Sequence, residues 1–284
     1  MYILLTDETN RRPSADSRFF IYGGLLFKVE KLPEIDLAIE KIRQRLHYKP
    51  SDHLKFDSNS RPNGVSFDDF VQAKREVIDL CLANGCKFIV HIIHHDIIRN
   101  QDPDQHIQWA ADYVIGRFNY FLDSEAKDYG ICIVDSLPVK AQFKYLSDKF
   151  SLGLTLASGK KTKLQRIKLF ASTTINASHA SSAMDIVLGS FRYCINNPKN
   201  RDAARHMIGK VVDMMWHTKV GGTYYVHDKG LIVRPDKSKI MSSSIKAEYD
   251  SLFAHINELL DSKSDSKTSS PEPEKTNDSQ KHSG

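Results

Sequence analysis

The sequence predicts an α/β protein with a mixed β-sheet flanked by helices on both faces. Short apolar runs of strand length alternate with longer segments in which apolar residues recur at helical spacing. The first two runs, over residues 1–6 and 19–27, are separated only by turn-prone residues. We therefore expect a hairpin of neighbouring strands, which makes the sheet mixed rather than parallel throughout.

The remaining elements follow in order along the chain. Apolar periodicity predicts helices over 33–46, 68–82, 107–122, 139–150 and 182–195, and apolar runs predict further strands over 87–95, 130–135 and 167–171. Residues 221–235 have the pattern of a hairpin that turns at Asp228 to Gly230. We expect residues 1–261 to form a single domain with helical insertions. Residues 262–284 contain no aromatic or aliphatic side chain, so we expect a disordered tail.

Composition narrows the class of protein. The 284 residues are 40% hydrophobic, which is enough to bury a sizeable core. No apolar stretch is long enough for a membrane helix, and the first residues lack the basic start of a signal peptide, so we expect a soluble, cytoplasmic protein without a membrane partner. The four cysteines lack the spacing of a zinc or redox site and are interpreted as buried free thiols. The net charge of +5 tolerates an anionic partner.

Acidic residues end two of the predicted strands. The first strand runs into Asp7 and Glu8, and the strand over 130–135 ends in Asp135. Ligands of open α/β sheets bind at the carboxyl ends of strands, so these acids are candidate site residues. Glu8 is expected only to support Asp7 and ranks below it, because adjacent residues of a strand point to opposite faces. The alternative is that each Asp caps a turn.

Asp185 is surrounded by apolar residues on every side of its predicted helix. A buried, unpaired carboxylate costs several kcal/mol, so Asp185 must be protonated, paired with a basic side chain or bound to a cation. Arg192, two turns further along, is the candidate partner for a purely structural salt bridge.

Several short motifs carry a family resemblance. The opening YILLTDETN, followed by FFIYGGLLF, resembles the start of the bacterial and archaeal family called domain of unknown function 3800. The segment from Ser182 to Asp185 resembles the Gln-x-x-Asp helix of that family, with Ser182 in place of Gln. HLKF resembles its Glu-x-Lys segment, with His53 in place of Glu and Lys55 retained, and GLIVRP resembles its closing strand. The likeness extends to about residue 235.

The resemblance implies a ribonuclease-H-like fold, in which acids from the first strand, a middle strand and a late helix hold two metal ions. Asp7, Asp135 and Asp185 occur in that order, with Glu8 or His53 to complete the set. Oxygen ligands of this kind suit Mg²⁺ or Mn²⁺. The expected function is a metal-dependent phosphodiesterase, in particular a nuclease acting on DNA or RNA. The alternatives are a catalytically silent interaction module of the same fold, because two motif positions are altered, and a metal-dependent phosphohydrolase of small nucleotides.

Basic residues are candidates for phosphate contacts. Lys160, Lys161 and Lys163 lie between the strand of Asp135 and the helix of Asp185, where they are expected to contact phosphates near the metals. A solvated basic loop is the equally weighted alternative. Lys55 is the preferred single candidate, either for a phosphate or for orienting a carboxylate. Neither a protein partner nor a homo-oligomer is excluded.

Two further patterns favour structural roles. The run HIIHHD from His91 is interpreted as strand-end histidines with satisfied hydrogen bonds, with metal binding as the alternative. The aromatic residues of the helix over 107–122 are interpreted as core or interface packing, with a base-stacking platform as the alternative. They are Trp109, Tyr113, Phe118, Tyr120 and Phe121.

Overall fold

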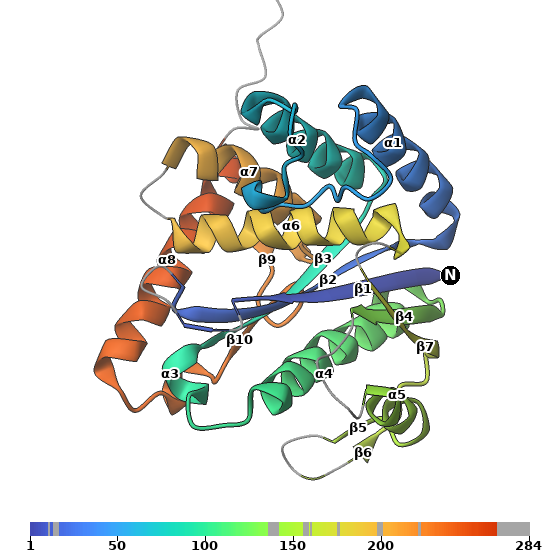
Figure 1. Ribbon diagram of the computed structural model, residues 1–284. Helices are drawn as coiled ribbons and strands as arrows, with labels where there is room; N and C mark the ends of the chain where they lie inside the picture. The colour runs from blue at the N-terminus through green and yellow to red at the C-terminus, as the bar shows by residue number, and fades with distance from the viewer. Residues whose placement is uncertain are drawn as a thin grey trace, which may run out of the picture.

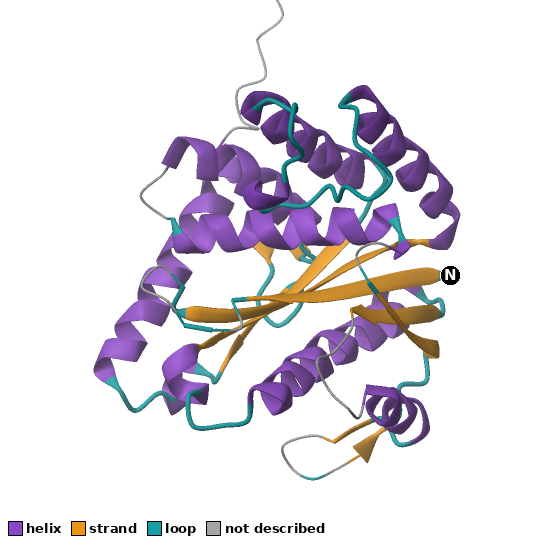
Figure 2. Ribbon diagram, viewed as in Figure 1, coloured by secondary structure: helices purple, strands orange, loops and turns teal. Residues whose placement is uncertain are grey.

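The computed structural model describes residues 1–10, 12–13, 17–135, 142–155, 159, 161–174, 177–197, 201–220 and 223–265. Within these residues a central sheet has the strand order β10-β3-β2-β1-β4-β7, and helices cover both of its faces (Figures 1 and 2). The predicted α/β class with a mixed sheet is therefore confirmed. No described helix is both long enough and apolar enough to span a membrane.

The central strands follow the apolar runs of the sequence. They are β1 (Tyr2–Thr9), β2 (Phe19–Lys28), β3 (Lys87–His94), β4 (Gly130–Asp135), β7 (Ile167–Thr173) and β10 (Leu231–Arg234). Two short ribbons lie outside the central sheet, formed by β5 (Leu154–Thr155) with β6 (Lys161–Thr162) and by β8 (Thr218–Val220) with β9 (Thr223–Tyr225). Every residue of β2 except its last is buried, as expected of a strand paired on both sides and covered on both faces.

The pairing directions bring most strand ends to one edge. β2 is antiparallel to both β1 and β3, whereas β4 runs parallel to β1, β7 parallel to β4, and β10 parallel to β3. It follows that β1, β3, β4, β7 and β10 all point the same way. Their carboxyl ends therefore share one edge of the sheet, which is where ligands bind in open α/β sheets.

The central sheet divides the core into two layers, and helices cover each of them. On one face lie α1 (Leu32–Arg45), α2 (Phe67–Ala83), α6 (His179–Asn196), α7 (Arg201–Met214) and α8 (Ser243–Asp265). On the other face lie α4 (Pro103–Phe121), which continues as a π-helical turn over Leu122–Ala126, and α5 (Gln142–Ser151). The short α3 (His95–Ile98) follows β3, and single 3₁₀ turns cover Val29–Lys31, Ser58–Ser60 and Lys237–Lys239.

Side-chain caps mark the starts of three of the long helices. Ser66, Asp102 and Ser178 precede α2, α4 and α6, and each accepts a hydrogen bond from a backbone N–H two or three residues further on, at 3.0–3.1 Å. These bonds satisfy amide groups that have no partner inside the helix. The cap at Ser178 thereby fixes the first turn of α6 in position.

Two expectations about the chain differ from the structure, and the start of a third element lies outside the described residues. The predicted hairpin at Asp228 is wrong, because β9 pairs with β8 while β10 joins β3 in the central sheet. The chain does turn there, with Asp228 at φ 56°. The apolar residues after the turn are drawn into the buried sheet, whereas β9 remains largely exposed. Helix α5 begins at Gln142, and residues 136–141 lie outside the described residues. The last helix extends to Asp265, four residues into the segment expected to be disordered, and residues 266–284 are not described.

The buried pair Thr6 and Tyr22 provides a test of the packing on the α4 face. Their hydroxyl oxygens are 2.7 Å apart, and the side chains are 3% and 1% exposed. Tyr22→Phe leaves the Thr6 hydroxyl without this partner, so we expect a loss of about 1–3 kcal/mol in the free energy of unfolding. Adding Thr6→Val removes both polar groups and should restore most of the loss. Urea denaturation of the two single variants and the double variant measures this coupling, and additive losses would contradict it.

Candidate metal centre

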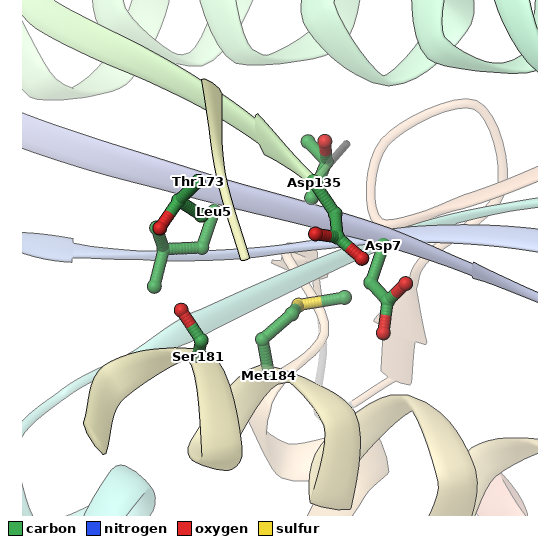
Figure 3. A pocket seen from close by; sticks show the side chains of 7 residues that line it. Leu5, Asp7, Asp135, Thr173, Ser181 and Met184 are labelled. Atoms are coloured by element: carbon green, nitrogen blue, oxygen red, sulfur yellow. The ribbon is translucent and has the colours of Figure 1, made fainter. Parts of the chain in front are cut away.

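Two acids meet at the carboxyl ends of adjacent parallel strands. The register of β1 and β4 pairs Thr6 with Val134, so the next residues, Asp7 and Asp135, come side by side. Asp135 is in turn paired with Thr173 on β7. Asp7 and Asp135 are half-buried and line one small pocket together with Thr173 (Figure 3). The strand pattern therefore predicted these two acids as neighbours correctly.

Helix α6 closes the floor of this pocket. Ser181 and Met184 contribute the lining from the helix, and Figure 3 shows both side chains directed toward the strands that carry the acids. The helix packs very closely on the sheet, because a Cβ at Gly23 of β2 would lie 2.7 Å from Leu188 and 3.2 Å from Met184. Ser181 lies in the first turn of α6, so the start of this helix adjoins the pocket.

The size and donors of the pocket suit a hard cation. Its cavity volume is ≈ 20 Å³, which accommodates about one water molecule or ion and excludes a nucleotide. The lining offers two carboxylates and the hydroxyl groups of Thr173 and Ser181, which are oxygen donors of the kind that Mg²⁺ or Mn²⁺ prefers. Thr6 also lines the pocket, and its hydroxyl group is hydrogen-bonded to that of Tyr22. Mg²⁺ commonly uses only one or two carboxylates and keeps several waters. Within the described residues, however, no three His, Cys, Asp or Glu side chains gather closely enough to hold a metal ion.

Glu8 lies on the opposite face of the sheet from Asp7. Ile3 and Leu5 of β1 belong to the core on the α6 side, whereas Leu4 belongs to the core on the α4 side. Strand alternation places Asp7 with the first pair and Glu8 with Leu4. Glu8 is also absent from the residues that line the Asp7 pocket. Its expected role beside Asp7 is therefore not supported by its position.

Asp185 does not line the pocket of Asp7 and Asp135. Its Oδ2 accepts a hydrogen bond of 2.6 Å from the backbone N–H of Phe56, in the segment between α1 and α2. Burial raises the pKa of Asp185 above its usual value, and the Phe56 N–H and the positive charges of Lys55 and Arg192 oppose this rise. The position of Asp185 therefore does not support the expected meeting of three acids, because its carboxylate is bonded to the 53–57 segment.

The 53–57 segment is tied to α6 through the peptide groups of Phe56. Its N–H is held by Asp185, and its carbonyl accepts a hydrogen bond of 3.2 Å from the buried ammonium of Lys74. Lys74 lies 4.6 Å from the centre of the Phe56 ring. Gly189 is required beneath that ring, since a Cβ there would approach it to 2.3 Å. We call residues 53–57 the strap, because they cross α6 and are fastened at both peptide groups of Phe56.

The two altered motif positions, His53 and Ser182, flank the contact between the strap and α6. They do not line the pocket of Asp7 and Asp135, which we call the acid pocket. His53 and Lys55 lie in the strap, half-buried, and Lys55 contributes to the potential at Asp185. Ser182 is buried but does not line the pocket, whereas its neighbour Ser181 does. Two roles were expected of Lys55, contact with a phosphate or orientation of a carboxylate. Its position beside Asp185 favours the second role over a phosphate contact at Asp7.

The basic run lies away from the acid pocket. Lys161 and Lys163 are exposed, in and beside the β5–β6 ribbon, which lies on the α4 side of the molecule (Figure 1). Lys163 donates a hydrogen bond of 2.8 Å to the backbone carbonyl of Ser151. Neither lysine lines the pocket of Asp7 and Asp135. Lys160 lies outside the described residues. The expected contact of this run with a phosphate near the two acids is not supported by these positions.

The histidine run divides between two environments. His94 matches the expectation, because its Nε2 lies 2.9 Å from Glu248 and its Nδ1 accepts the backbone N–H of Asp96. His91 differs, since it is buried and neither ring nitrogen has a hydrogen-bond partner among the described residues. His95 is the first residue of α3 rather than part of the strand. The four cysteines are buried free thiols, as expected.

Sequence reasoning missed two pocket residues, Thr173 and Ser181. The apolar run predicted β7 only as far as residue 171, and the strand continues to Thr173, beside Asp135. Serines 181 and 182 are adjacent on an apolar helix, so periodicity alone cannot tell which faces the sheet. The contact of Gly23 with Leu188 and Met184 marks the inward side of the helix, and Ser181 is one turn from Met184 on that side.

Comparison with known proteins yields only remote structural likeness. No protein-family model matches the chain, and no curated protein matches it. Among solved structures, Bst-RNase HIII in complex with Mn²⁺ is similar with a TM-score of 0.39 and 9% identity, over 75% of this chain and 62% of that one. A point mutant of Bst-RNase HIII gives 0.37 and 8%, over 74% and 61%. The chain thus spans less than two thirds of the length of both proteins.

The strap predicts a difference between two substitutions of Asp185. Asp185→Asn keeps an oxygen that accepts the Phe56 N–H, whereas Asp185→Ala leaves that amide without its partner. We expect Asp185→Ala to lower the free energy of unfolding by about 1–3 kcal/mol and Asp185→Asn to lower it less. Chemical denaturation measures both. Equal losses in the two variants would show that the hydrogen bond does not hold the strap.

The raised pKa of Asp185 predicts how its contribution changes with pH. A carboxyl whose pKa is higher in the folded state than its usual 3.8 binds its proton more tightly when folded. Its contribution to stability is therefore greatest at low pH and declines as the pH rises from 3.8 through the folded pKa. We expect the stability of the native protein relative to Asp185→Asn to fall across this window and to level off above it. A difference that is constant with pH would contradict the raised pKa.

Proposed function

We propose that this chain is a divalent-cation-dependent phosphodiesterase that acts on nucleic acid, with Asp7 and Asp135 as the cation ligands. The observation that carries the proposal is the placement of these two carboxylates on adjacent parallel strands, at the ligand-binding edge of the sheet, around a pocket of ion size. The ribonuclease-H-like arrangement implied by the family resemblance is part of this proposal, because it also takes acids from the first strand and a middle strand.

The residues present fit Mg²⁺ or Mn²⁺ as the cation. Asp7 and Asp135 would supply the charged ligands, and Ser181 and Thr173 add hydroxyl groups to the lining. A bound cation of this type polarises a phosphoryl oxygen and lowers the pKa of bound water. The chain's own contribution is to hold the two carboxylates at a fixed separation and to exclude bulk water on the α6 side. The reacting phosphate must lie outside the pocket, because ≈ 20 Å³ cannot contain it.

The position of Asp185 bears on the alternative of a silent interaction module. That alternative expects a site acid to be engaged by the protein itself, and Asp185 is held by the Phe56 N–H near Lys55 and Arg192. Under our proposal Asp185 fixes the strap instead of binding the cation, and two carboxylates suffice. A phosphohydrolase of small nucleotides would use the same two acids and differs in the size of its substrate.

We expect Asp7→Asn and Asp135→Asn to abolish cation binding, since each removes one of two charged ligands. The affinity for Mn²⁺ should fall by more than the roughly 10- to 100-fold that loss of an outer-sphere partner costs. Asp185→Asn should retain binding. Titration calorimetry with Mn²⁺ measures these affinities. Asp68→Asn is the matched control, because Asp68 is an exposed aspartate in the first turn of α2 and does not line the pocket.

Cleavage of labelled single-stranded and structured DNA and RNA tests the reaction itself. We expect cleavage in Mn²⁺ or Mg²⁺, none in EDTA, and none by Asp7→Asn or Asp135→Asn. Equal cleavage by the Asp7→Asn protein would reveal a contaminant and contradict the proposal. Cation binding without cleavage of any substrate would favour the interaction module, and hydrolysis of mononucleotides alone would favour the small-nucleotide enzyme.

A further inference from the structure

A second, much larger cavity lies on the opposite face of the sheet from the acid pocket. It has a volume of ≈ 700 Å³, within the range of about 300–1,000 Å³ that is typical of small-molecule sites. One side is the outer surface of α4, another is the β5–β6 ribbon, and a third is the end of β10 with the residues that follow it. Asp7 and Asp135 do not line it, so any ligand here binds independently of them.

Two aromatic rings of α4 line this cavity one turn apart. Trp109 is 44% exposed and is stacked on the ring of His106, with 8° between the ring planes. Tyr113 is 41% exposed and is stacked on the buried His91 at 4.9 Å and 9°. Phe118 and Phe121 of the same helix are buried, so the packing role expected of the helix holds for them. Trp109 and Tyr113 instead present supported, half-open aromatic surfaces to the cavity.

His91 is well suited to support the Tyr113 ring without adding charge. Its burial, and secondarily the nearby positive charge of Arg234, lower the pKa of His91 to about 3. The imidazole is therefore neutral at physiological pH. A neutral ring beneath Tyr113 leaves the positive charge of the cavity to the arginines, where a ligand can reach it.

Arginine side chains adjoin the aromatic surfaces. Arg117 lies one turn beyond Tyr113 on α4, and Arg234, at the end of β10, has its guanidinium 5.5 Å from the centre of the Tyr113 ring. Both arginines contact a single carboxylate oxygen of Asp228, at 3.3 and 2.8 Å. The side chain of Asp228 is 62% exposed, and exposed pairs of this kind contribute little to stability. An anionic ligand can therefore replace Asp228 at small cost.

We propose that this cavity binds a nucleotide, with the base stacked on Trp109 and the phosphate held by Arg117 and Arg234. Aromatic rings accept any base through stacking, and guanidinium groups bind phosphate oxygens in a bidentate manner. The exposed Lys161 and Lys163, in and beside the β5–β6 ribbon that lines the cavity, add positive charge on the same side. The nucleotide is either free or one unit of a single strand, and this proposal does not require that Asp7 and Asp135 cleave anything.

Titration calorimetry of the full chain with separate ligand fragments tests the proposal. We expect a nucleoside monophosphate to bind, and the nucleoside and ribose 5-phosphate each to bind more weakly, since each lacks one of the two recognised groups. Binding should also quench the fluorescence of Trp109, the more exposed of the two tryptophans in the chain. A short single-stranded oligonucleotide that binds more tightly than the mononucleotide identifies the ligand as a unit of a strand, and equal affinities identify it as a free nucleotide.

Substitutions locate the site and separate it from the acid pocket. Trp109→Ala should weaken binding by roughly 5- to 150-fold, the range produced by loss of one base–aromatic stack, and Trp109→Phe should restore part of it. Arg117→Gln should weaken binding of the monophosphate but not of the nucleoside. Tyr120→Ala is the matched control, because Tyr120 is equally exposed on α4 but does not line the cavity.

Besides loss of nucleotide binding in the Asp7→Asn control described below, two outcomes would overturn the proposal. One is the absence of nucleotide binding at millimolar concentration, and the other is binding that survives both Trp109→Ala and Arg117→Gln in proteins whose melting temperatures match that of the native chain. Asp7→Asn should retain full nucleotide binding. Loss of nucleotide binding in that variant would place the ligand at the acid pocket instead, so failure of this proposal is distinguishable from failure of the proposed phosphodiesterase.

Discussion

The parallel pairing of β1 with β4 is the contact on which the candidate metal centre depends. These strands lie far apart in the sequence, and their register alone sets Asp7 beside Asp135. Side chains alternate along a strand, so a slip of one residue in β4 would turn Asp135 to the α4 face and bury it against apolar residues. The apolar residues of both strands prevent such a slip, because Leu4 and Cys132 are fully buried on one face and Leu5 on the other.

Helix α6 completes the centre, and its burial imposes a second constraint. The helix is enclosed by the sheet on one side and by α1, α2 and α7 on others, so its single carboxylate needs a partner inside the protein. The strap supplies that partner through a backbone N–H instead of a side-chain cation. A backbone donor neutralises less charge than an arginine would, which is consistent with the raised pKa of Asp185. The same bond determines the path of the strap across α6.

The sequence predicted those features that follow from local pattern. Runs of apolar residues placed the central strands, and acids at the ends of two of them indicated the candidate metal centre. When a helix is buried on nearly all sides, its apolar periodicity does not show which side faces the sheet. The position of Asp185 relative to Asp7 could therefore not be predicted. Only the close approach of Gly23 to Leu188 and Met184, a tertiary contact, selects which side of α6 meets the sheet. The prediction of a hairpin over residues 221–235 was wrong for a similar reason. A turn at Asp228 is local, but the partner chosen by the strand after it depends on which edge of the sheet remains open.

The two recesses are the acid pocket and the cavity lined by Trp109 and Tyr113, which we call the aromatic cavity. Their chemistry is complementary, and the strand directions relate their positions. The acid pocket adjoins the ends of β1 and β4, and the aromatic cavity adjoins the end of β10, three strands away from β1 along the same edge. Three strand spacings of 4.7–4.9 Å separate β1 from β10 by roughly 14 Å along the edge, and the two sites also lie on opposite faces of the sheet, so the distance between them is larger. A stacked nucleic-acid strand advances about 3.4 Å per nucleotide, so a span of this length requires more than about four nucleotides. A mononucleotide therefore cannot reach both recesses, whereas a single strand that crosses the edge could place a base at Trp109 and a phosphate at Asp7. The acids repel phosphate unless a cation is present, while the arginines attract it without one. Strand capture by the cavity is thus expected to be independent of metal, and only the reaction at the acids requires it.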